Sequence, residues 1–406
     1  MNPEAFDQVF REHNSPALAS LIRILGDFTL AEEALQETWI SAATAWVEDL
    51  PANPAAWLVT SARRKAIDHL RRDATGNRKL AEVARAMPAF TEDDFDLDPQ
   101  TIRDDRLRLI FTACHPALTR EAQVALTLKT LGGLTTSEIA HAFLSQESAI
   151  AQRIVRAKRK IRDANIPYRI PEAHELPERL PSVLAVLYLV FNEGYSSSSN
   201  YHLIRGDLCS EAIRLARIIV SLMPDEAEVL GLLALMLLQD SRRLTRLDEH
   251  DDLVLLEDQD RSLWVHDQIV EGIALVERTL RMGPAGPYAL QAAIAAVHAE
   301  AASAAATRWD EIAELYARLE QSVQSPVIRL NHAVAIAMVE GPAPGLILID
   351  AIDGLDDYHL YHSARADLLR RLGRAAEACV SYNRALALAT NPAEQRFLNG
   401  RLSQLQ

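Results

Sequence analysis

Cysteine and aromatic residues are scarce in this chain, and long apolar runs are missing. Its three cysteines, Cys114, Cys209 and Cys379, lie far apart and form no CxxC pair. This spacing excludes a disulfide framework and indicates buried thiols in a reducing cytosol. Cys114-His115 has no second ligand pair at zinc spacing, so we expect a structural role and no metal. Without a signal peptide or an apolar run of roughly twenty residues, the sequence predicts a cytoplasmic protein with no membrane segment.

The composition favours helices and lacks the common motifs of enzymes. Aromatic residues make up 6% of the 406 residues and apolar residues 49%, with alanine and leucine dominant. No β-branched run alternates long enough for a convincing strand, so we predict an all-α protein of two or three domains. We find no nucleophile elbow, Walker loop, GxGxxG sequence or metal cluster, and therefore predict neither an enzyme nor a bound cofactor.

The net charge of −14 is unevenly distributed along the chain. Residues 1–165 hold 21 basic and 23 acidic residues, a net of −2, whereas residues 166–406 hold 21 and 33, a net of −12. The acidic second part would be repelled by phosphate. Only the first part, which has two concentrated basic patches, is a candidate for binding DNA.

The segment 145–162 has the pattern of an amphipathic basic helix. Apolar residues at i, i+4, i+7 and i+11 would form its buried face, namely Ile150, Ile154, Ala157 and Ile161. Its polar side would carry Ser148, Gln152, Arg153, Arg156, Arg159 and Lys160. An ordinary solvated helix would give the same pattern, so this alternative stays open for the segment taken alone.

A short helix is predicted just before the basic one. Thr135 and Glu138 have the spacing of a capping box, which begins a helix. Residues 144–146 would then make a tight turn, with Ser145 as the N-cap of the basic helix. A short helix, a turn and a basic helix together form a helix-turn-helix, whose second helix fits the major groove of DNA.

Two further helices, one acidic and one basic, are predicted within residues 1–73. The first would open at Thr29, with Glu32 as its capping-box partner, and would run to about Trp46. Its inner side would hold Leu35, Trp39, Ala42 and Trp46, and its outer side Glu32, Glu33, Gln36 and Glu37. After a break at residues 51–54, a helix over residues 57–72 would combine the apolar Leu58, Ile67 and Leu70 with the basic Arg63, Arg64, Lys65, Arg71 and Arg72. This helix too could be an ordinary solvated one.

The rest of the chain divides into an acidic linker and a long helical region. Residues 74–100 combine glycine and proline with an acidic run, which is typical of a solvated linker. Near the C-terminus, Gly373, Ala378, Tyr382 and Ala385 have the spacing of a tetratricopeptide (TPR) hairpin. Ala313, Leu346 and Ala378 follow one another at steps of 33 and 32 residues, close to the TPR period of about 34. Ala212 and Pro224 fit another hairpin, whereas residues 240–310 lose the register.

Together these segments resemble the extracytoplasmic-function (ECF) sigma factors of bacterial RNA polymerase. The pattern over residues 27–39 is similar to sigma region 2.2, which contacts the clamp helices of the core enzyme. Residues 54–72 are similar to regions 2.3 and 2.4, which open and read the −10 element. Residues 101–165 resemble region 4, which reads the −35 element. The resemblance covers residues 1–165 in the correct order, with the acidic linker between the two parts.

The resemblance also implies roles for individual residues. Core polymerase would be contacted by Asp27, Glu32, Glu33, Gln36 and Glu37. The −10 element would be bound and melted by Asn53, Trp57, Arg63, Arg64, Lys65, His69, Arg71 and Arg72. The −35 element would be read by Ser148, Gln152, Arg153, Arg156, Arg159 and Lys160. Arg64-Lys65 departs from the family, which often has an asparagine there.

Residues 166–406 resemble the C-terminal extension of an ECF subgroup with TPR-like repeats. Residues 191–195 and 255–261 are similar to recurring motifs of that extension, and we expect their polar side chains to cap helices rather than to catalyse. We predict that the acidic extension regulates the sigma part of the same chain, as an inhibitor or as a required contact, and binds a protein or peptide. The alternative is a helix-turn-helix activator with a TPR sensor, which would not bind core polymerase directly without DNA.

Overall fold

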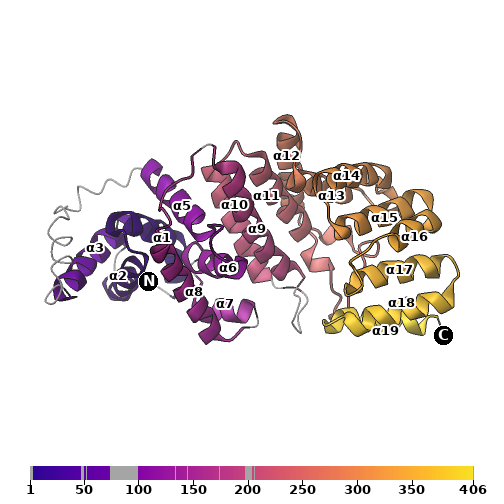
Figure 1. The fold of residues 1–406 in the computed structure, drawn as a ribbon, viewed down its shortest axis with the longest axis horizontal. Helices are drawn as coiled ribbons and strands as arrows, with labels where there is room; N and C mark the ends of the chain where they lie inside the picture. Colours follow the sequence, from indigo (N-terminus) through magenta and orange to yellow (C-terminus); the bar gives the residue numbers. More distant parts are fainter. Residues whose placement is uncertain are drawn as a thin grey trace. The chain divides into compact units, whose positions relative to one another are not determined.

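The computed structural model describes residues 3–46, 50–51, 53–73, 99–132, 134–143, 145–172, 174–196, 204 and 206–405. Every regular element in these ranges is a helix (Figure 1), so the predicted all-α class is confirmed. Two compact units divide the chain, Met1–Leu187 and Tyr188–Gln406. None of the helices in the described ranges has the length and apolarity needed to cross a membrane.

The first unit begins with three helices: α1 (Pro3–Leu25), α2 (Phe28–Ala45) and α3 (Pro54–Asp73). They pack on one another through apolar faces, and Leu21, Leu35 and Leu58 are at most 2% exposed. Helix α3 begins at Pro54, earlier than the predicted start, because proline fits a first helical turn where its missing N–H would have no helical partner.

The start of α2 differs from the predicted capping box. The carboxylate of Asp27 accepts hydrogen bonds from the backbone N–H groups of Thr29 at 2.8 Å and Leu30 at 2.9 Å. Gly26, with a φ of 67°, turns the chain between α1 and α2. The expectation that Thr29 opens the helix with Glu32 was therefore wrong, because Asp27 already satisfies the first helical donors.

The other described helices of the first unit are α5 (Pro99–Ala113), α6 (Arg120–Thr130), α7 (Thr136–Ala142), α8 (Glu147–Asp163) and the first part of α9 (Leu176–Tyr195). A buried carboxylate joins α5 to α1. Asp105 is 0% exposed and accepts hydrogen bonds from Ser20 at 3.0 Å, Arg23 at 2.9 Å and Arg108 at 2.6 Å. The predicted linker over residues 74–100 lies outside the described residues, except for the two residues that begin α5.

Residues 166–187 belong to the first compact unit, although the sequence placed them in the extension. The hydroxyl of Tyr168 donates to the backbone carbonyl of Ala19 at 2.9 Å. The guanidinium of Arg179 donates to the backbone carbonyl of Phe111 at 2.7 Å. Residues of this segment therefore contact both α1 and α5 of the first unit.

The second unit is a succession of helices, each packed against the next (Figure 1). They are α10 (Gly206–Leu222), α11 (Ala227–Asp240), α12 (His266–Arg281), α13 (Pro287–Glu300), α14 (Trp309–Ser322), α15 (Pro326–Glu340), α16 (Pro342–Asp350), α17 (His359–Arg371), α18 (Ala375–Leu388) and α19 (Pro392–Ser403), with the short 3-10 helices η2 (Arg243–Thr245), η3 (Arg261–Leu263) and η4 (Ala304–Ala306).

The predicted repeat positions fall at equivalent places in this succession. Ala313, Leu346 and Ala378 are buried in α14, α16 and α18, the second helices of the pairs α13–α14, α15–α16 and α17–α18. Gly373, with a φ of 74°, makes the turn between α17 and α18. Between α11 and α12 the chain is largely irregular, with only the short helices η2 and η3, which explains why the periodicity fails there.

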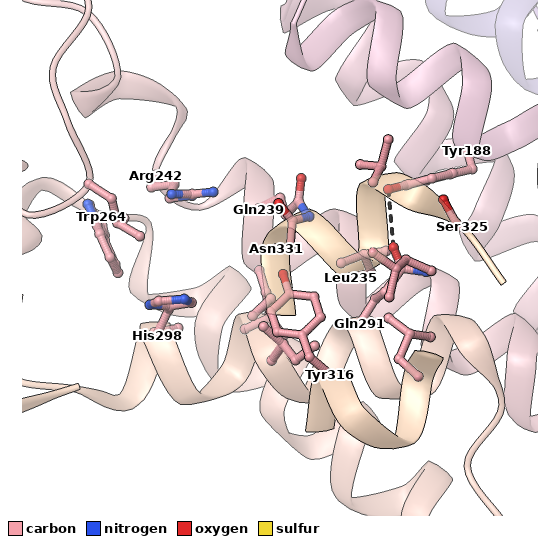
Figure 2. A pocket seen from close by; sticks show the side chains of 18 residues that line it. Tyr188, Leu235, Gln239, Arg242, Trp264, Gln291, His298, Tyr316, Ser325 and Asn331 are labelled. Atoms are coloured by element: carbon pink, nitrogen blue, oxygen red, sulfur yellow. Dashed lines mark hydrogen bonds between the residues drawn. The ribbon is translucent and has the colours of Figure 1, made fainter. Parts of the chain in front are cut away.

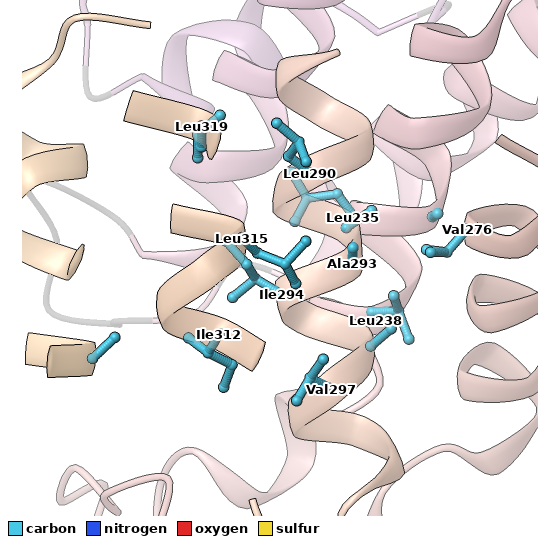
Figure 3. Packing of buried hydrophobic residues seen from close by; sticks show 14 of the residues in the cluster. Leu235, Leu238, Val276, Leu290, Ala293, Ile294, Val297, Ile312, Leu315 and Leu319 are labelled. Atoms are coloured by element: carbon cyan, nitrogen blue, oxygen red, sulfur yellow. The ribbon is translucent and has the colours of Figure 1, made fainter. Parts of the chain in front are cut away.

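Helices α11, α13 and α14 contribute most of the labelled residues of one buried apolar cluster of the second unit (Figure 3). Leu235 and Leu238 come from α11, Ile294 from α13, and all three are buried. A Cβ atom on Gly231 of α11 would lie 2.7 Å from the backbone nitrogen of Ala289 in α13. Only glycine therefore permits the close crossing of these two helices.

The cysteines follow the sequence-based expectation in two of three positions. All three are free thiols, and Cys114 and Cys209 are buried. Burial raises the pKa of Cys114 to about 11, which keeps this thiol protonated and unreactive at neutral pH. Cys379 is only half-buried, because its neighbour Ala378 takes the inward position on α18.

Candidate nucleic-acid interface

The basic helix α8 has the buried stripe that its sequence predicts. Ile150, Ile154, Ala157 and Ile161 are between 1% and 8% exposed and pack the helix into the first unit. This burial fixes the rotation of α8 and hence the directions in which its basic side chains point.

The helix before it begins as predicted. The backbone N–H of Thr135 donates to the carboxylate of Glu138 at 2.6 Å, and the N–H of Glu138 donates to the hydroxyl of Thr135 at 3.1 Å. These two hydrogen bonds form the predicted capping box of α7.

The turn between α7 and α8 is arranged differently from the prediction. Ser145 is not the N-cap of α8; its backbone N–H donates to the carbonyl of Ala140 at 2.9 Å and closes the preceding helix. Gln146 takes the N-cap position, without a hydrogen bond from its side chain. Leu144, the first residue of the predicted turn, lies outside the described residues.

The predicted −35 residues line the solvent side of α8. Ser148, Gln152, Arg156, Arg159 and Lys160 are exposed, and Arg153 is half-buried. Near the C-terminal end, Arg159 donates to the carboxylate of Asp163 at 3.1 Å. The rest of this row faces water along about three helical turns, which suits insertion into a major groove.

A third side of α8 faces α2, which the sequence did not indicate. Lys158 forms an ion pair with Glu32, and both side chains are largely covered, at 12% and 16% exposed. Its ammonium group also lies 6.0 Å from the centre of the Phe28 ring. Burial lowers the pKa of Lys158 to about 8, so it still carries its proton at neutral pH.

A cavity of about 500 Å³ lies between α2 and α8. Its polar lining includes Asp27 at the N-cap of α2, Glu32, Glu33 and Gln36 on α2, and Lys158, Arg159 and Arg162 on α8. Four of the five residues predicted to contact core polymerase therefore face the helix predicted to read DNA. The acidic and basic surfaces of the first unit partly cover one another.

The predicted −10 helix α3 uses several of its basic residues internally. Lys65 donates to the backbone carbonyl of Glu37 at 3.0 Å and to the hydroxyl of Ser41 at 2.8 Å. His69 lies 2.9 Å from the carboxylate of Glu37. These contacts join α3 to α2, so Glu37 is held by the predicted −10 helix. Among the basic residues predicted on α3 whose side chains are described, Arg64 is the exposed one.

Arg63 corrects the predicted basic face. Its side chain is buried, at 6% exposed, and this burial lowers its pKa. Arg63, Arg64 and Lys65 are consecutive, and each residue turns about 100° around a helix, so the three cannot share one face. The side chains of Arg71 and Arg72 lie outside the described residues.

Asn53 and Trp57 have identifiable structural roles at the start of α3. The side chain of Asn53 accepts a hydrogen bond from the backbone N–H of Ala56 at 3.1 Å, as an N-cap does. The ring of Trp57 is half-buried and lies 5.1 Å from that of Trp46, which in turn lies 5.6 Å from that of Trp39. Of the predicted melting loop, residues 47–49 and 52 lie outside the described residues.

Two protein-family models match parts of the chain. The family model described as sigma-70 region 2 matches residues 9–75, and a family of unknown function (DUF6596) matches residues 179–280. The chain is 43% identical over 393 residues to the uncharacterized protein R00370 of Rhizobium meliloti (strain 1021), which covers 96% of this chain and 93% of that protein.

The N-terminal part is also similar to proteins named as sigma factors. It is 27% identical over 158 residues to the ECF RNA polymerase sigma factor SigK of Mycobacterium ulcerans (strain Agy99), covering 38% of this chain and 83% of that protein. It is 29% identical over 165 residues to the protein of the same name from Mycobacterium tuberculosis (strain ATCC 25618 / H37Rv), covering 39% and 84%.

These matches define the class of the protein as a sigma factor, which acts in transcription initiation and is not an enzyme. The chain belongs to the ECF sigma factors, here with a C-terminal extension that includes the match to the family of unknown function.

Proposed function

We propose that the chain binds core RNA polymerase and directs recognition of the −10 and −35 elements, promoter melting and initiation. The observation that carries the proposal is the placement, in one compact unit, of an acidic helix and two basic helices in the order of sigma regions 2 and 4. We assign residues 1–73 to region 2, 74–100 to an acidic linker, 101–165 to region 4 and the second compact unit, 188–406, to a TPR-like regulatory extension, with residues 166–187 attached to the sigma part. Core polymerase and promoter DNA as partners would place the chain in the cytoplasm.

For the −35 element we assign the exposed row of α8 to the major groove. Gln152 and Arg156 have the side chains that pair with adenine and guanine edges, and Arg153 and Ser148 flank them. Arg159 and Lys160 lie toward the helix end, where they would contact phosphates and position the helix.

For the −10 element we assign the exposed side of α3 and the loop before it. Arg64 would contact phosphates, and Lys65 and His69 would do so by exchanging their partners on α2. Trp57, with Asn53 beside it, would hold an unstacked base after release from Trp46. Arg71 and Arg72 keep the role that the resemblance implies, whereas buried Arg63 is left out of this surface.

For core polymerase we assign the outer side of α2. Glu33 and Gln36 are exposed, Asp27 caps the helix, and Glu32 and Glu37 are engaged by Lys158 and His69. Docking of α2 on the polymerase would therefore replace contacts within the first unit, and it would release α8 at the same time.

For residues 166–406 we assign regulation of the sigma part and binding of a protein or peptide. The net charge of −12 over these residues supports repulsion from promoter phosphates. The succession of helix pairs supports a surface for a partner segment. The extension would act on its own sigma part at high effective concentration, because both belong to one chain.

The test uses the full-length chain, purified core polymerase and labelled promoter DNA. We expect the chain to bind core polymerase without DNA, and charge reversal by Glu33→Lys to weaken that binding, because an exposed carboxylate is inverted on the docking side. Binding to duplex DNA with no binding to free core polymerase would instead indicate a helix-turn-helix activator.

The DNA contact is tested in the same system with Arg156→Ala. Loss of a base contact should weaken promoter binding about tenfold and relax specificity at one position of the −35 element, whereas loss of a phosphate contact would reduce affinity for all sequences. Arg281→Ala is the matched control, since Arg281 is an exposed helical arginine of the second unit. Unchanged promoter affinity in Arg156→Ala would show that this side of α8 does not face DNA.

A further inference from the structure

The second unit contains a cavity of about 320 Å³ whose walls come from α9, α11, α13, α14 and α15 and from the segment between α11 and α12. Apolar side chains such as Leu235, Ile294 and Leu319 line part of it, together with the indole of Trp264. Figure 2 shows Arg242, Trp264 and His298 together at one end of the view. The volume lies at the lower end of the range for pockets that bind small ligands.

The charge of this cavity is opposite to that of the region around it. Arg242 is the one charged side chain among the described lining residues, and no carboxylate lines the cavity. Residues 166–406, in contrast, carry a net charge of −12. A lone guanidinium in a half-enclosed cavity attracts an anion more strongly than one in open water, because the surrounding protein reduces screening.

Arg242 differs from the two arginines that follow it. Arg243 donates to the backbone carbonyl of Gly206 at 3.1 Å, and Arg246 donates to the backbone carbonyl of Tyr195. The described residues supply no hydrogen bond or ion pair to the guanidinium of Arg242, which lies 5.8 Å from the centre of the Tyr195 ring. Its five donors are therefore available to a ligand.

The cavity also offers neutral hydrogen-bonding groups. Gln239 and Asn331 present amide side chains, and Tyr316 contributes its ring and hydroxyl (Figure 2). The Nδ1 atom of His298 is buried without a hydrogen-bond partner. Burial lowers the pKa of His298 to about 4, so the ring is neutral at pH 7 and can donate or accept one hydrogen bond.

The motif at residues 255–261 contributes Leu256 to the wall of the cavity and supports Trp264 through Gln259 and Arg261. The indole of Trp264 donates to the hydroxyl of Thr245 at 3.0 Å, and that hydroxyl lies 3.3 Å from the side-chain oxygen of Gln259. Arg261 donates to the backbone carbonyl of His298 at 2.5 Å and lies over the Trp264 ring at 4.7 Å. These contacts hold the wall in place, so a ligand would meet a largely preformed site.

We infer that this cavity binds a ligand with one carboxylate on an apolar body, with the carboxylate at Arg242 and the body against Leu235 and Ile294. Two sources share this chemistry: the C-terminus of a peptide and a free organic acid. A peptide end would use the amide groups of the cavity, whereas an organic acid would not. The site belongs to the extension and is independent of the proposed contacts with polymerase and DNA.

The test measures direct binding to the full chain by isothermal titration calorimetry. The probes are N-acetyl-leucyl-leucine with a free carboxylate, the same dipeptide with a C-terminal amide, and hexanoate. We expect the free-carboxylate dipeptide to bind at least tenfold more tightly than its amide. Hexanoate binding as tightly as the dipeptide would identify an organic acid as the source, and tighter dipeptide binding would identify a peptide terminus.

Substitutions of lining residues test whether the probes bind in this cavity. Arg242→Gln should reduce carboxylate binding at least tenfold and leave the amide probe unchanged, whereas Arg281→Gln, at an exposed arginine on α12, should change neither. Asn331→Leu, at an exposed position that cannot disturb the core, should weaken the dipeptide about threefold. The inference is overturned if no carboxylate probe binds at millimolar concentration, or if Arg242→Gln and Asn331→Leu both bind as the unaltered chain does.

Discussion

Two junctions between helices distant in sequence differ: one in the first unit is built on a buried charge, and one in the second unit depends on a close approach of backbones. In the first unit the buried carboxylate of Asp105 on α5 accepts hydrogen bonds from Ser20 and Arg23 on α1. In the second unit α11 and α13 cross at Gly231, where their backbones approach closely, and the carboxylate of Glu228 on α11 accepts hydrogen bonds from the N–H groups of Tyr288 and Ala289. A junction made of hydrogen bonds and ion pairs is weakened when any one partner is removed, whereas a tightly packed junction is weakened when atoms are added to it. The two units should therefore fail under different substitutions.

The largest effect is expected from Asp105→Asn. The substitution keeps the shape of the side chain but removes the charge that Arg23 and Arg108 share, which should destabilise the first unit by about 3 kcal/mol. Urea unfolding, followed by tryptophan fluorescence in a chain whose Trp264 and Trp309 of the second unit are replaced by phenylalanine, measures the change in the first unit. Asp163→Asn is the control, because Asp163 is exposed beside Arg159, and it should give no measurable change. Equal stability of the two variants would contradict a structural role for the buried carboxylate.

Gly231→Ala should have the next largest effect, in the second unit. The added methyl group would lie within 3 Å of the backbone of Ala289, and the resulting strain should exceed the usual helical preference for alanine, for a net loss of about 2 kcal/mol. Gly400→Ala in α19 provides the matched control, since nothing lies within 4 Å of its added Cβ atom. Thermal unfolding compares the two, and a neutral or stabilising Gly231→Ala would show that the helices can separate at little cost.

The smallest effect concerns His298, which makes the second unit sensitive to acid although its core is apolar. Its pKa is lowered from an ordinary value of 6.5 to about 4, so the unfolded chain binds a proton more readily than the folded one. The contribution is complete above pH 6.5 and is lost as the pH falls toward 4. The contribution of His298 to the free energy of unfolding should decrease by about 1 kcal/mol between about pH 7 and about pH 5.5. His298→Gln should flatten this part of the stability profile, and an unchanged slope would mean that His298 is solvated.

Periodicity predicted the elements whose residues repeat regularly. The stripe of Ile150, Ile154 and Ala157 was found because a helix buries every third or fourth residue. The capping box of Thr135 and Glu138 was found because its partners are close in sequence.

Contacts between distant residues could not be predicted in the same way. Asp105 lies in a helix of mixed charge, where an aspartate normally faces water, and nothing in the sequence indicates its partners 82 and 85 residues away. No local pattern indicates the partner of Lys158 either, because Glu32 is 126 positions earlier in the chain.

The candidate sites show the same difference between local patterns, which the sequence reveals, and contacts between distant residues, which it does not. The exposed row on α8 follows from the period of one helix, and the structure agrees for every residue of the row except half-buried Arg153. Arg63 was misplaced because composition counts charges without their direction around the helix. The cavity around Arg242 has walls from five helices and an irregular segment, so no local pattern could indicate it.

The pairing of Lys158 with Glu32 has a consequence for the protein among the many non-specific sites of a chromosome. Proteins that display all their positive charge are held by any stretch of DNA, and each neutralised cation reduces that attraction. In the free chain one lysine of α8 is neutralised and the cavity beside it is lined by carboxylates of α2. We therefore expect the unbound factor to be held less tightly by chromosomal DNA than a factor with Lys158 free, and the proposed docking of core polymerase on α2 would make this one charge of α8 available where a promoter can use it.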